Sequence, residues 1–345
     1  MKRSVLILST VVALTSTIAA CSSGGDGADG VTVGIGYFQS PTLNGETLIS
    51  ARSDLSDNIG GTLKLTPIES GVAGLAALKG GAFSFISGIG NPPMVGAIAS
   101  NTDVKVVLAQ SYDAAALVVG DDITSDDDLR GKAIGALQGS SEDFEIRGWL
   151  KAKGLDDTKV VGFPSEAAIG AAFKAGRIDG AYAWVTVVND LKQDPTVRQV
   201  VTAEEIAELG YSSFNVLAVT DKFSSDHPEV VQQVVCQYLN AQALLTGDDR
   251  EKVITDAAGS VGAESATAVA GTTSIPFISA DKQLSIFTAG TGGDVAGGDL
   301  AKSYVQTADF LKEQGRIDSV PSSNQIVERI DATYVQKAID DGCGA

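Results

Sequence analysis

The chain has 345 residues and carries 43 acidic against 25 basic side chains, a net charge of −18 at neutral pH. This balance excludes nucleic-acid binding, because a phosphate backbone needs patches of Lys and Arg. The length exceeds what one ordinary hydrophobic core can serve and predicts two lobes.

A short basic start and a mostly apolar run open the chain. Lys2 and Arg3 precede residues 5–20, a run shorter and more polar than the roughly 20 apolar residues of a membrane-spanning helix. This pattern predicts a signal peptide over residues 1–20. The run ends in Ile-Ala-Ala-Cys, which resembles a bacterial lipobox, in which Cys21 is diacylated and becomes the first mature residue. The alternative is an ordinary cleaved signal with a chance cysteine.

The segment 21–30 is rich in Gly, Ser and Asp, so it cannot bury enough apolar surface to order itself. We expect a lipidated flexible tether that holds the protein on a membrane face. The other two cysteines, Cys236 and Cys343, are expected to pair in an oxidising exterior, tying the C-terminal tail to an upstream helix. The alternative is two unpaired thiols.

Strand and helix patterns alternate along the rest of the chain. Helix 227–246 is expected to be capped by Asp226, with Pro228 in its first turn. Beyond it the chain is predicted to be mainly helical, with a Gly-rich loop over 290–298. Period-two patterns and apolar runs predict strands, and longer segments between turn residues predict helices. The predicted strands are 31–37, 61–68, 83–86, 104–109, 117–120, 132–137, 160–163, 179–184 and 214–219, and the predicted helices before 227 are 48–56, 72–79, 94–99, 142–153 and 166–174, with a helical turn at 125–129.

This alternation predicts an α/β fold with doubly wound parallel sheets, and the length predicts two of them. We expect the chain to cross between lobes near 113–120 and 211–217. Residues 31–115 and 216–345, with the C-terminal helices, would then form lobe 1, and residues 116–215 would form lobe 2. Ligands in such sheets bind at the C-terminal ends of strands. Two facing lobes would make a cleft that closes on a solute.

The residue types and their spacing give little support to an enzymatic function. The one histidine, His227, lies at a predicted helix start, where an exposed structural role is the simpler interpretation. Residues 34–36, Gly-Ile-Gly, are a weak match to a dinucleotide fingerprint and more simply a tight strand end. The sequence shows no metal-ligand spacing and no nucleophile with a base. We therefore expect no catalytic residue, no metal and no cofactor.

Small polar residues follow several predicted strands: Gln39, Ser40, Asn91, Ser140 and Ser141. Hydroxyl groups together with free N–H groups at a helix start suit an oxyanion, even in an acidic protein. The alternative role for the two serines is helix capping. Because these loops converge at the C-terminal ends of strands in two lobes, they predict a ligand site in the cleft.

Five segments carry a resemblance to a known family: 176–184 (GRIDGAYAW), 214–223 with 226–231 (FNVLAVTDKF and DHPEVV), 69–80 (ESGVAGLAALKG), 128–132 (DLRGK) and 310–315 (FLKEQG). The chain resembles the taurine-binding members of the nitrate/sulfonate/taurine-type solute-binding proteins of ABC importers. The resemblance covers essentially the whole mature chain in order. It implies a two-lobed periplasmic-binding-protein type II fold, each lobe a doubly wound sheet.

The resemblance also implies roles for individual residues. Trp184 would pack against the ligand, and Ser140 and Ser141 would meet a sulfonate. Gln39, Ser40 and Asn91 would line the cleft from lobe 1.

The sequence departs from the family at the position expected to meet a ligand ammonium. Taurine binders have an aspartate after the aromatic of the returning strand, and this chain has Asn215, which brings no charge. Glu142 and Asp143 replace neutral or basic residues of the family pattern, and Asp113 lies near the first crossing. One of these acidic residues supplies the displaced carboxylate, or they only favour the helix N-terminus through its dipole.

The sequence thus predicts an extracytoplasmic receptor, anchored to the cell membrane by a lipid on Cys21, that delivers taurine or a related small sulfonate to an ABC permease. A monomer is expected. The alternatives are the same transport role for another small anion or zwitterion and, on the same scaffold, an enzyme.

Overall fold

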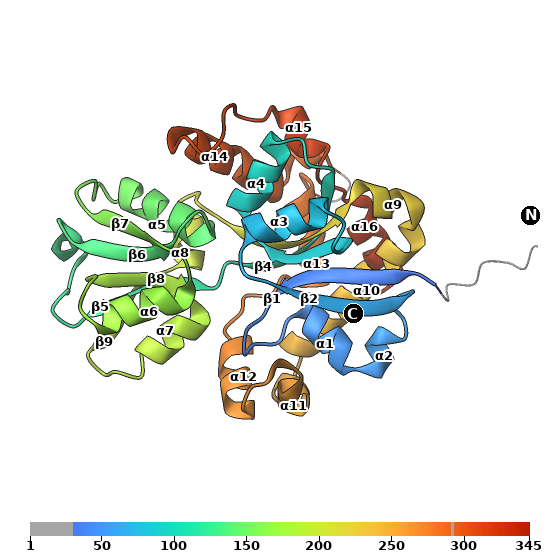
Figure 1. Ribbon diagram of the computed structural model, residues 1–345, viewed down its shortest axis with the longest axis horizontal. Coiled ribbons are helices and arrows are strands. Elements are labelled where there is room, and N and C mark those ends of the chain that lie inside the picture. Colours follow the sequence, from blue (N-terminus) through green and yellow to red (C-terminus); the bar gives the residue numbers. More distant parts are fainter. Residues whose placement is uncertain (1–29, 291–292) are drawn as a thin grey trace, which may run out of the picture.

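The computed structural model describes residues 30–290 and 293–345; the predicted signal peptide, Cys21 and residues 22–29 of the tether lie outside this part. Two five-stranded sheets form two lobes that lie side by side (Figure 1). The predicted two-lobed α/β fold is confirmed. Over the described ranges, no helix has the length and apolar character needed to cross a bilayer.

The first lobe is built on the sheet β2-β1-β3-β10-β4. Its strands are β1 (Thr32–Phe38), β2 (Thr62–Ile68), β3 (Phe85–Ile89), β4 (Val104–Tyr112) and β10 (Phe214–Thr220). Strand β1 runs parallel to β2 and β3, whereas β10 runs antiparallel to both β3 and β4. The prediction of parallel sheets is therefore wrong for β10. The reason is connectivity: β4 leads out to the second lobe and β10 leads back from it, so the two strands must run in opposite directions.

Helices from both ends of the chain cover this sheet (Figure 1). They are α1 (Gly45–Ala51), α2 (Ser53–Ser56), α3 (Gly71–Lys79), α4 (Asn91–Ala99), α9 (Asp221–Asp226), α10 (Pro228–Thr246), α11 (Arg250–Ala257), α12 (Ser265–Thr272), α13 (Ala280–Phe287), α14 (Asp299–Glu313), α15 (Ser323–Val327) and α16 (Thr333–Asp340). Leucine, isoleucine, valine and phenylalanine side chains of the sheet and these helices form one continuous core.

Two helix boundaries differ from the sequence expectation. The predicted helix 48–56 is broken at Arg52, whose backbone is extended. Asp226 does not cap α10: it ends the short helix α9 and pairs with Lys222, and His227 takes the N-cap position with Pro228 following it. The extra helix arises because the Thr220 hydroxyl accepts the Phe223 N–H and starts a turn before the proline.

The second lobe is built on the sheet β7-β6-β8-β5-β9. Its strands are β5 (Ala115–Gly120), β6 (Ala133–Leu137), β7 (Lys159–Phe163), β8 (Gly180–Trp184) and β9 (Val197–Thr202), and its helices are α5 (Ser141–Ala152), α6 (Glu166–Lys174), α7 (Val185–Leu191) and α8 (Ala203–Glu208), with a 3-10 turn at Asp126–Leu129. A separate hydrophobic core lies on each face of this sheet. The sequence did not predict α7, β9 or α8, and β5 pairs antiparallel with both of its neighbours.

The chain crosses between the lobes twice. The first crossing is Asp113–Ala114, between β4 and β5, and the second is residues 209–213, between α8 and β10. The two crossings lie against each other, because the Asp113 N–H donates to the Ser213 carbonyl at 3.2 Å. Beside them, Phe144 of α5 packs edge-to-face on Phe310 of α14, with ring centroids 5.3 Å apart.

The predicted disulfide between Cys236 and Cys343 is confirmed. It ties the C-terminal tail beyond α16 to α10 across a sequence separation of 107 residues. The Gly344 N–H donates to the Asn240 side chain beside it at 2.8 Å. The tail is thus fixed to the first lobe by a covalent bond and a hydrogen bond.

Candidate ligand site between the lobes

The C-terminal edge of the second sheet places most of the candidate residues. Helix α5 begins directly after β6, α6 begins after β7, and β8 ends at Trp184. Ser140 is the N-cap of α5: its hydroxyl accepts the Asp143 N–H at 3.4 Å and donates to the Leu137 carbonyl at 2.7 Å. The Ser140 hydroxyl therefore caps α5, as its position predicted. Its proton is already donated to the Leu137 carbonyl.

Ser141 lies where the two lobes meet. Its side chain is buried, and its hydroxyl accepts a hydrogen bond from the Ser213 hydroxyl at 2.7 Å. A Cβ at Gly90 of the first lobe would lie 2.2 Å from the Ser141 hydroxyl and 4.0 Å from the Asn215 side-chain oxygen. The structure therefore brings Ser141 and Asn215 together, and only glycine at position 90 leaves room for them.

The remaining candidates of the first lobe divide into two kinds. Asn91 is fully buried, and its amide is used inside the protein: it donates to Ser303 at 3.1 Å and accepts the Phe214 N–H at 3.1 Å. It joins α4, α14 and β10, which is a structural role. Gln39, after β1, is exposed, and the hydroxyl of Ser40 hydrogen-bonds that of Thr42.

Four carboxyl groups gather on the second lobe's side of the site. Asp113 lies in the first crossing, Glu142 and Glu145 lie one turn apart on α5, and Glu166 is the first residue of α6. Asp113, Glu142 and Glu145 are 4%, 7% and 1% exposed. Glu145 accepts the hydroxyl proton of Tyr182 at 2.7 Å, and Glu166 accepts the Trp184 N–H at 2.9 Å. We call Asp113, Glu142, Glu145 and Glu166 the acidic cluster.

The members of the acidic cluster hold their protons more tightly than exposed carboxyl groups do. Burial, and then the charge of Glu142, raise the pKa of Asp113 well above its usual value. Burial, followed by the charge of Asp113, does the same to the pKa of Glu145, and burial raises the pKa of Glu142. Burial and the charge of Glu142 raise the pKa of Glu166 to about 8. The charge of Glu142 thus contributes to the raised pKa of both Asp113 and Glu166, and the charge of Asp113 contributes to that of Glu145.

The carboxylate of Asp143, which follows Glu142 in the sequence, is ion-paired with two arginines. Its carboxylate meets Arg147 at 2.6 Å and Arg316 at 2.8 Å, and it also accepts the Gly139 N–H at 3.1 Å. Arg316 lies beyond α14 in the first lobe, so this ion pair joins the two lobes. By contrast, no ion pair among residues 30–290 and 293–345 includes a member of the acidic cluster.

Trp184 ends β8, opposite Ala115 of β5, and its side chain is half-buried. It therefore lies two residues along the sheet from Asp113 and beside Glu166, which holds its N–H. Within the part of the chain that the structure describes, no group of three or more His, Cys, Asp or Glu residues is arranged to hold a metal ion. An indole ring can attract an organic cation through its face.

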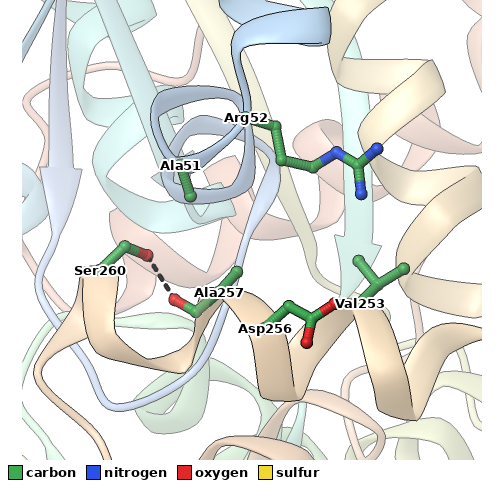
Figure 2. A pocket seen from close by; sticks show the side chains of 6 residues that line it. All are labelled: Ala51, Arg52, Val253, Asp256, Ala257 and Ser260. Atoms are coloured by element: carbon green, nitrogen blue, oxygen red, sulfur yellow. Dashed lines mark hydrogen bonds between the residues drawn. The ribbon is translucent and has the colours of Figure 1, made fainter.

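Two hollows lie elsewhere. A small one of about 210 Å³ lies between α1 and α11 of the first lobe (Figure 2). A groove of about 660 Å³ runs along α3, α4 and α14 and reaches Gln138 and Gly139 of the second lobe. Two of the residues that line the small hollow, Arg52 and Asp256, are charged, and Arg52 is ion-paired with Asp54. It is lined by Ala51, Arg52, Val253, Asp256, Ala257 and Ser260.

Sequence reasoning missed Glu145 and Glu166. Glu145 follows Glu142 by three residues, which places both on one face of a helix, so its position was readable from the predicted helix 142–153. The sequence around Glu166 did not indicate a functional role, because acidic residues are common at the starts of helices, where they interact favourably with the helix dipole.

The chain was compared with known proteins. The model of the NMT1-like family matches residues 26–259. The taurine-binding periplasmic protein of Escherichia coli is 27% identical over 289 residues, covering 80% of this chain and 85% of that protein. The alkanesulfonate-binding protein SsuA from Xanthomonas axonopodis pv. citri, solved with MOPS bound, has a TM-score of 0.67 at 20% identity, over 88% of this chain and 99% of that one. The desulfurization enzyme DSZB has a TM-score of 0.56 at 16% identity, over 90% of this chain and 99% of that one.

Proposed function

This chain belongs to the NMT1-like family, and from that premise we propose that it is an extracytoplasmic solute receptor that binds taurine or a related small sulfonate between its lobes and delivers it to an ABC permease. The similarity to a taurine-binding periplasmic protein over most of both chains supports the solute class. A lipid on Cys21 would anchor the receptor to the cell membrane, and one chain would act as a monomer.

One observation of the structure supports the proposal: polar groups of both lobes and of the second crossing meet at Ser141. The Ser141 hydroxyl accepts from Ser213 and thus keeps its own proton for another acceptor, and the Asn215 amide lies close by. A sulfonate has three oxygens and one full charge, so it needs several donors at once. Trp184, with Glu166 beside it, would cover the other end of a short ligand.

The roles of the other candidates follow from their contacts. Gln39 would close over the ligand from the first lobe, because its side chain is exposed, whereas Ser40 would act through the loop that its hydrogen bonds to Thr42 hold in place. Ser140 and Asn91 would act indirectly, by fixing the start of α5 and of α4. The carboxyl groups of Asp113 and Glu142 would replace the family aspartate that Asn215 lacks.

A ligand panel tests the proposal. Thermal shift measurements with taurine, ethanesulfonate, nitrate and sulfate select a ligand, because a molecule that binds the native state raises its melting temperature. Isothermal titration then compares wild type with Ser141→Ala and Trp184→Ala. Each variant should lose at least about tenfold in affinity, since a hydrogen bond to a charged group contributes roughly 1.5–3 kcal/mol and tenfold corresponds to about 1.4 kcal/mol.

Ser323→Ala, at an exposed position on α15, is the matched control and should bind as wild type does. Wild-type affinity in both site variants would show that the ligand binds elsewhere. An enzyme on this scaffold is the second candidate, because the desulfurization enzyme DSZB shares the fold. Release of sulfite from a bound sulfonate would support the enzyme and contradict the receptor.

A further inference from the structure

Strand β10 lies between β3 and β4 and carries Asn215 at its start. On the β4 side, the register shifts next to this residue. Residues 215 and 216 of β10 pair with residues 111 and 109 of β4, so Gln110 is an extra residue on β4. An extra residue of this kind is a β-bulge, which bends the strand and re-aims the side chains beside it.

A second bulge lies on the other side of β10, in β3. Residues 216 and 218 of β10 pair with residues 89 and 86 of β3, so Ser87 and Gly88 together lie opposite one residue of β10. The backbone of Gly88 has a φ of +72°, the left-handed conformation that glycine takes in one common type of bulge. Two residues further on, Gly90 lies against the Ser141 hydroxyl of the second lobe. The two bulges therefore determine how β3 and β10 approach the candidate ligand site.

The Gln110 side chain connects the two bulges. Its amide oxygen accepts the Gly88 N–H at 2.7 Å, and its amide nitrogen donates to the Ser87 hydroxyl at 2.9 Å. The Ser87 hydroxyl in turn donates to a carboxyl oxygen of Glu46, the second residue of α1, at 2.7 Å. Glu46, Ser87 and Gln110 are 2%, 1% and 5% exposed, so these hydrogen bonds are shielded from water. We call Glu46, Ser87, Gln110 and the Gly88 N–H the buried chain.

The direction of each hydrogen bond in the buried chain is determined by its neighbours. A backbone N–H only donates, so the amide oxygen of Gln110 faces Gly88 and its NH₂ group faces Ser87. Ser87 then donates its single proton to Glu46. Without an acceptor at position 46, the Ser87 hydroxyl could donate to Gln110 instead, and the turned amide would set its NH₂ group against the Gly88 N–H. A buried donor that loses its acceptor in this way is costly.

We propose that Glu46, Ser87 and Gln110 are positioning residues, which touch no ligand and shape the ligand site by fixing the two bulges beside β10. The bulge in β3 sets the approach of Gly90 to Ser141, and the bulge in β4 sets the direction of the neighbouring part of β10. This inference rests on the proposed function in that the ligand binds between the lobes, next to Ser141.

Amide hydrogen exchange of the ligand-free protein tests whether the buried chain fixes the bulge in β3. Glu46→Leu removes the acceptor at the end of the chain, and Ser87→Ala interrupts the chain with a smaller change to the core. In each variant the Gly88 amide should exchange at least tenfold faster relative to the amide of Ile35 in β1, which reports a general loss of stability. Glu46→Gln keeps an oxygen that can accept from Ser87, so its Gly88 amide should exchange as in wild type. Tyr238→Phe is the matched control, because the Tyr238 hydroxyl donates to the same Glu46 oxygen at 3.3 Å but lies outside the buried chain.

Isothermal titration with taurine and with ethanesulfonate tests the effect on the ligand site. Glu46→Leu and Ser87→Ala should each bind the probe that wild type binds about tenfold more weakly. Glu46→Gln and Tyr238→Phe should bind it as wild type does. Three results would each overturn the inference: Gly88 exchange that rises no more than that of Ile35, equal effects of Tyr238→Phe and Glu46→Leu, or selectively faster Gly88 exchange without a loss of affinity.

If wild type binds neither probe, the sulfonate assignment fails and the positioning role is decided by the Asn215 side chain. The side-chain amide resonance of Asn215 should then shift in Glu46→Leu and in Ser87→Ala and stay in place in Tyr238→Phe. An unshifted resonance in the first two variants would overturn the inference.

Discussion

The ion pair between Asp143 and Arg316 joins the two lobes, and replacing Arg316 by glutamine should weaken ligand binding. Asp143 is 1% exposed and Arg316 is 28% exposed at the side chain, so the pair is largely shielded from solvent. A hydrogen bond between charged groups contributes roughly 1.5–3 kcal/mol. We expect the lower end, about 1.5 kcal/mol, because Asp143 keeps Arg147 and the Gly139 N–H after the change.

That free energy would be lost from the arrangement with the lobes together, which is the one that binds ligand. Affinity for the solute should therefore fall about tenfold. Isothermal titration measures the affinity, and small-angle scattering with saturating ligand shows whether the lobes still come together. Lys302→Gln is the matched control, since Lys302 is an exposed residue of the neighbouring α14 paired with Asp299 at 3.4 Å. Unchanged affinity with a lower unfolding free energy would refute the reasoning, because it would mean that the pair persists when the lobes separate.

Three further predictions concern the tail, the anchor and pH. Cys236→Ala should lower the free energy of unfolding by about 2–4 kcal/mol in denaturant titration, because the crosslink restricts the unfolded chain; an equal unfolding midpoint in the two proteins would contradict this. Cys21→Ala should release the protein from the membrane fraction and leave its affinity unchanged, whereas equal fractionation of mutant and wild type would argue against lipidation. The ligand-free protein should lose stability as pH rises toward 8, because the pKa of Glu166 is raised from about 4.5 to about 8 and the folded state therefore binds the extra proton. Thermal melts from pH 5 to 8 should show the fall, and Glu166→Gln should flatten it; identical slopes would refute it.

The same coupling of protonation to the state of the protein predicts how the affinity for an amine-bearing ligand changes with pH. A cation stabilises the ionised form of the carboxyl groups that face the site, namely Asp113, Glu142 and Glu166, with Glu145 and the Tyr182 hydroxyl packed behind them. Binding should therefore release protons and strengthen between pH 6 and 8. Titrations in two buffers of different ionisation enthalpy count the released protons.

Much of the fold was readable from local patterns. The alternation of strands and helices followed from the period of the apolar residues, and the two lobes followed from the length of the chain. The helix at 166–174 begins and ends where the sequence predicted, since Ser165 caps it and the Gly176 turn follows it. The segment 185–208 was missed, because the short helices α7 and α8 and the half-exposed strand β9 have no strong period.

The sequence by itself predicted the two lobes, the pairing of the two late cysteines and the family. It also named Asp113 and Glu142 as candidates for a carboxylate. Only the tertiary structure decided which polar groups remain for a ligand. The side-chain amide of Asn91 hydrogen-bonds to Ser303 and Phe214, which are distant in the sequence. By contrast, Glu166 keeps one carboxyl oxygen that receives no hydrogen bond from any described donor. The physical reason is that the local sequence determines on which face of a helix or strand a side chain lies. The burial of that side chain and its hydrogen-bond partners depend on segments that are distant in the sequence and pack against it in the fold.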